Sequence, residues 1–458
     1  MNGNLNTVPC RNEVPVWQET DVLVIGGGPA GIASAVCAAR HGARAVLCDQ
    51  NGYLGGLSTA GLVGPFMTCY DPPMKNQVIR GFFEEFVQRM IREQGAIHPS
   101  QIDPGTSYTA WRYRGHAHIT PFSSEVLKTT AEDMCLEAGV QLLYHVMFQE
   151  AVMKDDRIDA AIFAAKGGPL AIRAKIYIDC TGDADLAAAA GVPFEVGKDN
   201  DGHPQPASLF FIIDGVDREV LNAYRAEHED ISAMWFMDKV AEARARGEFP
   251  VPREKVAIYE SVDGTWRVNM SRLDHYDYCD PADITRAEIE GRKQMKIIFR
   301  FLKDHIPGCE NIRLLCSAPM LGVRESRRIK GSFVLTGAEM KLSTRHPDDI
   351  FLSGNRFDTH VGSRVIYETT KGDAAYGVPY RILLPQHADN LLVAGRCVSG
   401  DQECLAAIRV MPPCFAMGQA AGTAAALCVK NEVSPSQVDT DTLRSLLRAD
   451  GAYLEEGS

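Results

Sequence analysis

The chain has 458 residues and a formal net charge of −12, from 47 Lys and Arg against 59 Asp and Glu. This length can bury large cores and predicts two or three domains. An acidic chain without a basic run is not expected to bind nucleic acid or an anionic membrane surface. The 13 cysteines are scattered, with no C-x-x-C pair. They predict reduced thiols in a cytoplasmic protein and no metal site.

Two stretches are candidates for a signal peptide or a membrane span. The first 20 residues are polar and contain Pro9 and Pro15, so they do not read as a signal peptide. Residues 410–429 carry no charge, but they are mostly Ala and Gly and include Gln419 and Thr423. This composition favours a buried helix over a membrane span, so no membrane partner is expected.

The strongest motif lies near the start of the chain. Asp21 and the apolar residues 22–25 are predicted to form a strand that runs into Gly26, Gly28 and Gly31, spaced G-x-G-x-x-G. The first glycine makes the tight turn, the second leaves room for a pyrophosphate, and the third packs the helix on the strand. Pro29 and Ala30 would open that helix, whose free N–H groups attract phosphate.

An acidic residue accompanies the motif. A second strand over 44–48 ends at Asp49, about 20 residues beyond the last glycine, where a carboxylate meets ribose hydroxyls. A strand, a helix and an acidic partner together make dinucleotide binding the favoured interpretation. The alternative is a tight strand-to-helix turn without a ligand.

Residues 50–183 are predicted to contain a loop, two helices and several strands. A glycine-rich loop over 50–61 contains Gly55-Gly56, which would let a second backbone segment touch a large ligand. Helices are predicted over 76–94 and 123–139, with an Arg-, Tyr- and His-rich loop over 101–119 between them. A strand at 140–145 precedes a β-meander over 148–175. A separate strand over 175–179 leads to Thr181-Gly182-Asp183, where Asp183 can cap the next helix.

The pattern changes near residue 200. Mixed strands and helices, with long helices near 217–247 and 283–305, predict an inserted α+β substrate domain over 201–385. An apolar strand and a glycine return within 386–435, and a helix of small residues starts near Pro413. We therefore predict an α/β fold whose Rossmann-type domain, a parallel sheet plus β-meander, spans 18–200 and 386–435, with a tail over 436–458.

Three stretches resemble the FAD-dependent oxidoreductases of the glutathione-reductase type. They are the Gly26 motif with Asp49, the Gly55-Gly56 loop, and Ala394-Gly395-Arg396 followed by Gly400-Asp401. Other phrases look like a bacterial branch of these enzymes with fumarate-reductase-flavoprotein features. They are Cys180-Thr-Gly-Asp-Ala-Asp, Gly322-Val-Arg-Glu-Ser-Arg-Arg-Ile, Val378-Pro-Tyr-Arg-Ile-Leu-Leu-Pro and Arg409-Val-Met-Pro-Pro-Cys. The resemblance covers about residues 20 to 430.

The resemblance implies FAD as the cofactor and a set of contacts to it. Asp49 would bind the adenosine ribose, the backbone near Met147 the adenine, and Asp401 the ribityl chain. The helix N-terminus near Cys414 would face the flavin. The full implied set is Gly26, Gly28, Pro29, Ala30, Gly31, Asp49, Gln50, Gly55, Gly56, Leu57, Ser58, Met147, Gly182, Gly395, Asp401 and Cys414.

Several features of relatives are absent from the sequence. There is no C-x4-C pair after Gly56, no second dinucleotide turn in mid-chain, and no cysteine cluster for iron–sulfur centres. No histidine occurs between His41 and His98, where related enzymes attach their flavin. We therefore expect non-covalent FAD and poor direct reduction by NADH or NADPH.

The predicted activity is hydride transfer between the flavin and a small polar molecule, oxidising C–OH or C–NH in a sugar-like or hydroxy-acid substrate. One alternative is reduction of an activated C=C bond; another is an electron-relay subunit of a complex. The predicted catalytic residues are Arg324 or Arg327 as an anion clamp and His118 for the proton. The electron acceptor and a possible homo-oligomer stay open.

Overall fold

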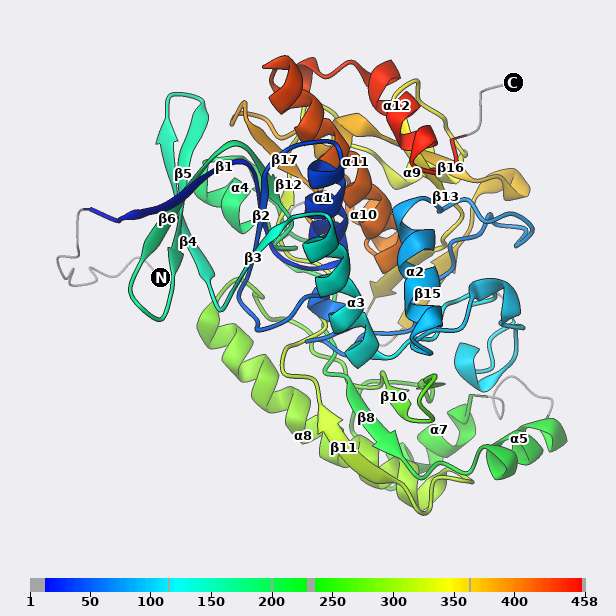
Figure 1. Ribbon diagram of the computed structural model, residues 1–458. Coiled ribbons are helices and arrows are strands. Elements are labelled where there is room, and N and C mark those ends of the chain that lie inside the picture. The colour runs from blue at the N-terminus through cyan, green and yellow to red at the C-terminus, as the bar shows by residue number, and fades with distance from the viewer. Residues whose placement is uncertain (1–12, 114–115, 199–200, 229–234, 362–363, 455–458) are drawn as a thin grey trace.

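The structure is a computed structural model that describes residues 13–113, 116–198, 201–228, 235–361 and 364–454. Parts of the predictions for the first 20 residues, the 101–119 loop, the 217–247 helix and the tail lie outside these ranges. Within them, the architecture is α/β, as predicted (Figure 1). Two large bodies of packed side chains share the chain, one around a parallel sheet and one around a small antiparallel sheet.

The parallel layer carries the glycine motif. Its strands lie in the order β3, β2, β1 and β6, with β17 on the far side of β6. Every neighbouring pair in this layer is parallel. The strands are β1 (Val16–Ile25), β2 (Ala45–Asp49), β3 (Gln141–Tyr144), β6 (Leu170–Asp179) and β17 (Leu391–Val393). Their carboxyl ends therefore meet at one edge of the sheet, where ligands of such folds bind.

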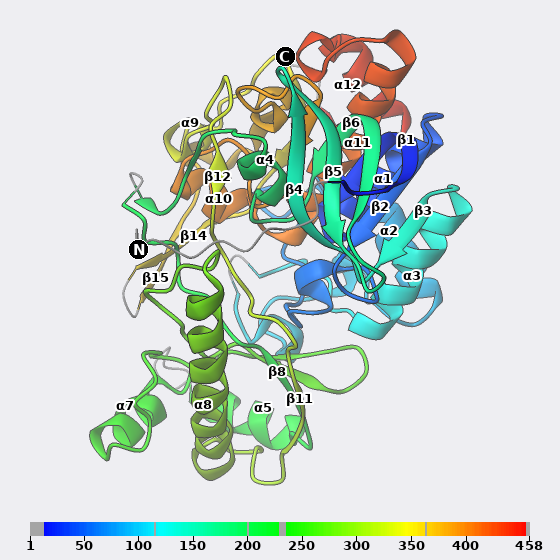
Figure 2. The same ribbon diagram turned by 90° about the vertical axis from the view of Figure 1, so that its left-hand side faces the viewer.

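The predicted β-meander joins this layer through one strand. The antiparallel strands β4 (Met147–Lys154) and β5 (Arg157–Ala164) pair with the first part of β6 (Figure 2). The sequence suggested a break near residue 175, but β6 is continuous to Asp179. It is continuous because β1 pairs with it along both halves, from Val16 opposite Ala171 to Ile25 opposite Asp179.

Two helices pack backbone to backbone on this sheet. They are α1 (Pro29–Arg40) and α11 (Met411–Asn431), the latter containing the charge-free stretch. A β-carbon added to Gly418 or Gly422 would strike the carbonyl of Ala30 or Ser34. Small residues thus bring the two helix axes unusually close, and α11 is buried along most of its length. Within the described ranges, no helix is long and apolar enough to cross a membrane.

A second core lies below the first in Figure 1. Its antiparallel sheet has the order β11-β8-β10-β9, and its buried side chains come from residues 207–321 together with Ala110 and Trp111. The elements are β8 (Phe211–Asp214), α5 (Arg218–Glu227), α7 (Met237–Ala245), β9 (Ile258–Glu260), β10 (Trp266–Val268), α8 (Pro281–His305) and β11 (Arg313–Ser317).

The hydrophobic clusters divide the chain differently from the predicted insertion over 201–385. Buried side chains between Leu335 and Leu383 pack into the first core, against α11. That region holds α9 (Gly337–Lys341), β13 (Asp349–Ser353), β14 (Phe357–Val361), β15 (Arg364–Glu368) and β16 (Tyr376–Pro379). The domain boundaries stay a prediction.

The remaining elements pack mainly around the first core and the parallel sheet. They are α2 (Phe82–Arg92), α3 (Ser124–Glu137), α4 (Asp185–Ala189), β7 (Phe194–Glu195), β12 (Arg328–Ile329), α10 (Gln402–Ile408) and α12 (Thr440–Ala449). The apolar segment 314–321 precedes the 324–328 run, but it does not carry this run as a continuous buried strand. Instead Leu314 and Leu315 are exposed on the edge strand β11, and only β12 pairs within the run.

Candidate functional site

A cavity of about 1070 Å³ reaches from the glycine turn to the second core. Side chains and backbone from both cores line it. One end is walled by the turn between β1 and α1, and the other by a group of arginines and a lysine. The cavity can therefore hold a dinucleotide at one end and a second molecule at the other.

The glycine turn has the geometry that its spacing predicts. Gly26 has a φ of 99°, in the left-handed region that favours glycine. A β-carbon at Gly31 would collide with the carbonyl of Gly26, so the helix starts tight against the strand. At Gly28 an added β-carbon would meet only the Cα of Gly56, at 3.9 Å. The space beside Gly28 therefore fits a pyrophosphate.

Two helix N-termini converge on the cavity. Pro29 and Ala30 at the start of α1, and Val410, Met411 and Cys414 at the start of α11, line its wall. Neither helix has a side-chain cap or an acidic residue in its first turn. Their positive dipole ends and free N–H groups suit phosphate at α1 and an electron-rich ring edge at α11.

Asp49 ends β2 beside this turn. Its carboxylate accepts hydrogen bonds from the backbone N–H of Gly27, at 2.6 Å, and of Asn51, at 2.7 Å. Burial raises the pKa of Asp49, and these bonds oppose the rise. The N–H of Val146 donates to the Asp49 carbonyl at 3.2 Å, which brings Met147 to the same end of the cavity as Gln50.

The second glycine loop lies against the first. The N–H of Gly55 donates to the carbonyl of Gly27 at 2.8 Å, and Gly55 has a φ of 112°. Gly56 and Leu57 line the cavity, whereas Gly55 and Ser58 lie behind them. The Ser58 hydroxyl donates to the Gly55 carbonyl at 2.5 Å. Gly55 and Ser58 thus hold the loop in place.

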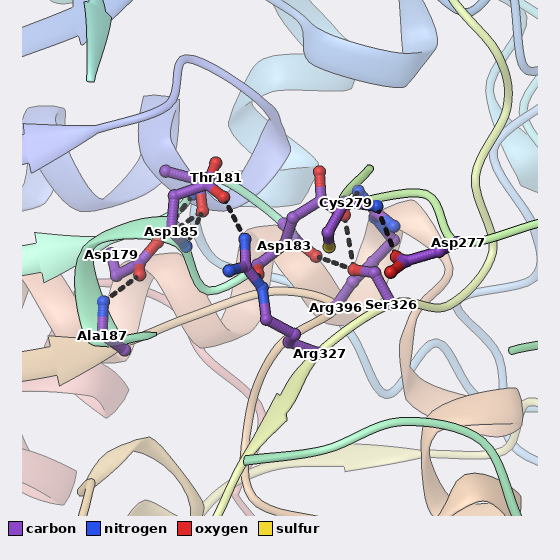
Figure 3. A network of polar contacts seen from close by, with 11 residues as sticks. Asp179, Thr181, Asp183, Asp185, Ala187, Asp277, Cys279, Ser326, Arg327 and Arg396 are labelled. Atoms are coloured by element: carbon purple, nitrogen blue, oxygen red, sulfur yellow. Dashed lines mark hydrogen bonds and ion pairs between the residues drawn. The ribbon is translucent and has the colours of Figure 1, made fainter. Parts of the chain in front are cut away.

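The Thr-Gly-Asp loop after β6 is joined to the 324–328 run (Figure 3). The Ser326 hydroxyl donates to Asp183 at 2.5 Å, and Arg396 pairs with the same carboxylate at 3.2 Å. Arg327 donates to the Asp183 carbonyl at 2.7 Å and pairs with Asp185. Asp183 does not cap a helix, because α4 starts at Asp185 after Ala184.

Charge crowding in this loop affects one carboxyl group. Desolvation and the neighbouring carboxylates Asp183 and Asp179 raise the pKa of Asp185 to about 6, and Arg327 opposes them. Gly182 and Gly395 line the cavity next to this network. Gly182 has a φ of 83°, in the left-handed region that favours glycine, and the guanidinium of Arg396 lies close to where a β-carbon would be.

The four charged residues of the 324–328 run point to different places. Glu325 and Arg328 form an ion pair buried between the segments around Gly197 and Gly400. Arg327 reaches the cavity wall but is held by the Thr-Gly-Asp loop. Arg324 alone lies at the cationic end of the cavity. The structure thus separates the two arginines that were predicted as interchangeable clamps.

The cationic end brings together residues far apart in the sequence. It is lined by Arg112, Arg253, Lys255, Arg324, Arg356 and Arg409, with Asp358 as the opposing carboxylate. Arg324 donates to the Pro206 carbonyl at 2.6 Å and to the Ser208 hydroxyl at 2.9 Å, both neutral oxygens. Desolvation, and then Arg409 and Arg253, lower the pKa of Arg324 to about 9.

Two further arginines at this end also donate to neutral oxygens. Arg253 is buried and donates to the Asn269 carbonyl at 3.0 Å. Arg409 donates to the Asp358 carbonyl at 3.0 Å, while its nearest carboxylate oxygen, also of Asp358, lies at 3.9 Å. In the part of the chain that the structure describes, positive charge at this end exceeds its carboxylate partners.

The histidine prediction is not supported by the geometry. His118 lies off the cavity wall, with Nδ1 bonded to the Pro99 carbonyl at 3.0 Å and its ring stacked on Tyr70. His116 lines the cavity instead. Its Nε2 lies 2.7 Å from Nη1 of Arg112, and burial together with this arginine holds the pKa of His116 well below its usual value.

Asp401 is also placed away from the cavity wall. Its carboxylate accepts hydrogen bonds from the N–H of Cys404 at 2.7 Å and of Gly337 at 3.0 Å, so it caps α10 and ties it to α9. Gly31 likewise lies behind the wall. The other expected contacts do line the cavity: Gly26, Gly28, Pro29, Ala30, Asp49, Gln50, Gly56, Leu57, Met147, Gly182, Gly395 and Cys414.

Sequence reasoning missed Arg253 and Lys255. They lie between α7 and β9 in the segment Pro252-Arg-Glu-Lys, with no motif around them. Their importance comes from the neighbours that folding brings to them. Among the described residues, no group of His, Cys, Asp and Glu side chains is arranged to hold a metal ion.

One family model matches most of the chain. The sequence model of the family described as FAD dependent oxidoreductase matches residues 21–447. Thiamine thiazole synthase of Aeropyrum pernix is 28% identical over 174 residues, which cover 36% of this chain and 54% of that protein. The enzyme of the same name from Methanococcus maripaludis strain C7 is 24% identical over 172 residues, covering 36% and 56%. This chain spans about half the length of these curated relatives.

Solved structures with a similar course of the chain were also found. The p-nitrophenol 4-monooxygenase of Pseudomonas putida DLL-E4 has a TM-score of 0.46 and 12% identity, covering 96% of this chain and 90% of that chain. A geranylgeranyl bacteriochlorophyll reductase-like protein of Thermoplasma acidophilum has a TM-score of 0.42 and 13% identity, covering 94% and 91%.

Proposed function

Because this chain belongs to the family of FAD-dependent oxidoreductases, we propose that it oxidises a C–OH or C–NH group of a small organic anion, such as a hydroxy acid. FAD supplies the two-electron, hydride-accepting chemistry when it is bound. The glycine turn, Asp49 and the two helix N-termini would hold it at one end of the cavity. The cationic end would hold the substrate.

The observation that carries this proposal is the surplus of positive charge around Arg324. Arg324 and Arg253 donate to neutral oxygens, and no carboxylate of the described chain pairs with either. Burying a cation without a partner is costly, so such a site is stabilised by an anion. A guanidinium fork binds a carboxylate through two parallel hydrogen bonds, which also fixes its orientation.

The chain's own residues then have defined tasks. Arg324, Arg253 and Arg409 would bind the anionic group, and Asn269 and Tyr259, which also line this end, would contact the rest of the molecule. This arrangement fixes which carbon of the substrate points toward the glycine turn. Positioning of this kind lowers the barrier because the reacting atoms are already oriented.

Anaerobic bleaching of the flavin tests the proposal. The holoenzyme would be mixed, without oxygen, with 2-hydroxy acids and 2-amino acids, and with neutral partners of matched shape such as lactamide and propane-1,2-diol. We expect at least one acid to bleach the flavin, with saturation, and its neutral partner to be inactive. Equal bleaching by the neutral partner would contradict the proposal. Reoxidation of reduced enzyme by an unsaturated acid, with no bleaching by any saturated one, would assign the opposite direction.

A further inference from the structure

Oxidation of a C–OH or C–NH group also needs an acceptor for the proton. We propose that Lys255 is this catalytic residue: its side-chain amine takes the proton from the substrate held by the arginines. This inference rests on the proposed function, and it assigns the proton to a residue that no sequence motif marks. It replaces His118, which lies off the cavity wall.

The position of Lys255 supports the role. The residue precedes β9 (Ile258–Glu260) and its side chain lines the cationic end of the cavity. Its Nζ lies 4.6 Å from the ring centre of Trp235 and 5.4 Å from that of Tyr367. Within the described residues it has neither a hydrogen bond nor an ion pair. Aromatic faces lie near the amine, and no carboxylate of the described residues is paired with it.

The charges around Lys255 favour the neutral amine. Arg112 and Arg253 repel its charged form, while Asp358 and Glu254 favour that form. Desolvation by burial is the largest influence, and together these influences lower the pKa of Lys255 to about 7. The arginines keep their protons near neutral pH, because even the lowered pKa of Arg324, about 9, lies well above it. Lys255 is therefore the cation of this wall that can exist as a base near neutral pH.

The neighbouring titratable groups are less suited. His116 faces Arg112 at 2.7 Å, so gaining a proton there would place two cations in contact. Burial already holds its pKa well below the usual value. Asp185 has a carboxyl group near the right pKa, but it lies in the Thr-Gly-Asp loop and pairs with Arg327. Lys255 is the base that lies among the substrate-binding arginines.

In the proposed step, the amine of Lys255 accepts a proton from the substrate. The O–H or N–H bond of the substrate breaks, and its proton forms a third N–H bond on the lone pair of Nζ. The electron pair of the broken bond becomes the second bond of the new C=O or C=N group. The C–H hydrogen would leave with its own electron pair, which bound FAD, the oxidant implied by the family, would accept. Lys255 ends as an ammonium group, which later returns the proton to water.

The first experiment needs no identified substrate. Malonate, a dicarboxylate without a group to oxidise, would be titrated into the oxidised holoenzyme at pH 8 by calorimetry, in two buffers of different ionisation enthalpy. We expect malonate to bind the wild type with uptake of close to one proton, because its second carboxylate, which the substrate lacks, would lie beside Lys255 and favour the ammonium form. Lys255→Met and Lys255→Arg should bind malonate with almost no uptake.

The outcomes separate the two proposals. Unchanged proton uptake in Lys255→Met would overturn the role of Lys255 and leave the anion site intact. Failure of malonate to bind the wild type would refute the anion site, and this inference with it. Lys239→Met is the matched control, since Lys239 lies on α7 in the same core and its nearest carboxylate, of Glu242, is at 3.9 Å. It should behave like the wild type.

The second experiment follows bleaching by an acid that is active in the panel above. Lys255→Ala should bleach roughly 10²-fold or more slowly than the wild type, which is the usual contribution of a positioned base. Added ethylamine should restore the rate, and more basic amines should restore more. Lys255→Arg, which keeps the charge, should stay slow. Wild-type bleaching in Lys255→Arg would overturn the proposal. FAD content and the melting temperature report whether each variant is folded.

Discussion

Glu325 and Arg328 form an ion pair whose side chains are 0% and 2% exposed, in a run of charged residues beside the cavity. Glu325 also accepts hydrogen bonds from the N–H of Gln205 at 2.9 Å and from Gln402 at 2.7 Å. Arg328 donates to the carbonyls of Gly197 and Gly400. The pair therefore joins its own run to Gly197, to Gln205 and to the 400–402 segment, and it is structural although its neighbour Arg324 lines the site.

Removing one partner of this pair should destabilise the fold. Glu325→Gln removes the buried counter-charge of the Arg328 guanidinium and leaves only the more distant carboxylate of Glu195, at 4.0 Å, so it should cost about 3–5 kcal/mol. Chemical unfolding of the FAD-saturated protein measures the loss. The exposed pair of Arg40 and Glu85, at 2.7 Å, provides the control, since Glu85→Gln should cost no more than about 1 kcal/mol. Equal effects of the two substitutions would contradict the structural role.

Gly28→Val should abolish FAD binding without unfolding the protein. The space beside Gly28 contains only the Cα of Gly56, at 3.9 Å, so a valine fits the chain but fills the place of the pyrophosphate. The FAD content after purification measures cofactor binding, and circular dichroism shows whether the variant is folded. Gly167→Ala, at a glycine with nothing within 4 Å, is the matched control and should keep full FAD.

Asp49→Ala should weaken FAD binding rather than abolish it. The carboxylate would supply one or two hydrogen bonds to ribose, each about 1.5–3 kcal/mol when charge-assisted. It also holds the N–H groups of Gly27 and Asn51, so the variant loosens the turn itself. Fluorescence titration of the apoprotein with FAD gives the affinity. An unchanged dissociation constant would show that Asp49 serves the turn alone.

Arg324→Ala should impair turnover while FAD content stays normal. Loss of about 3 kcal/mol of transition-state binding would lower kcat/KM by roughly 10²-fold. Arg327→Ala should act differently, because Arg327 holds Asp183 and Asp185 of the loop beside Gly182. We expect it to change FAD affinity more than the KM of the acid. Arg313→Ala, at an exposed arginine paired with Asp214, is the control. If Arg324→Ala mainly changed the FAD affinity and Arg327→Ala mainly lowered kcat/KM, the two assignments would have to be exchanged.

The stability of the protein should depend on pH through Lys255. Its pKa is about 7 in the folded protein against 10.5 in the unfolded chain. Between these values the unfolded state binds more protons, so stability rises with pH. Relative to Lys255→Met, the wild type should gain unfolding free energy from about pH 7 to pH 10. Urea unfolding at several pH values measures this difference, and a flat difference would show that the lysine titrates normally.

The FAD should be held without a covalent bond. No histidine lies between His41 and His98, and the thiol of Cys414 at the cavity wall has its pKa raised to about 12 by burial, so it is a poor nucleophile. Acid precipitation should release all of the flavin into the supernatant, where its absorbance is measured. Yellow colour that remains in the pellet would contradict this prediction.

The parts of the protein that the sequence predicted share a physical basis. The turn at Gly26, Gly28 and Gly31, the β-meander and the buried α11 follow from local steric demands and from the spacing of apolar residues. These influences act over a few residues, so they can be read from the chain alone. The same holds for the α/β class and for the cofactor, which the family match supports.

The cationic end of the cavity was decided by tertiary structure. Sequence reasoning listed Arg324, Arg327 and His118 together, but only the fold sends Arg324 to the cationic end, Arg327 to the Thr-Gly-Asp loop and His118 behind the wall. Lys255 carried no signal at all. The proton affinity of a side chain depends on its hydration and on the charges near it, and here those charges come from Arg112, Arg253 and Asp358. Groups so far apart in the chain act on one another only after folding has brought them together.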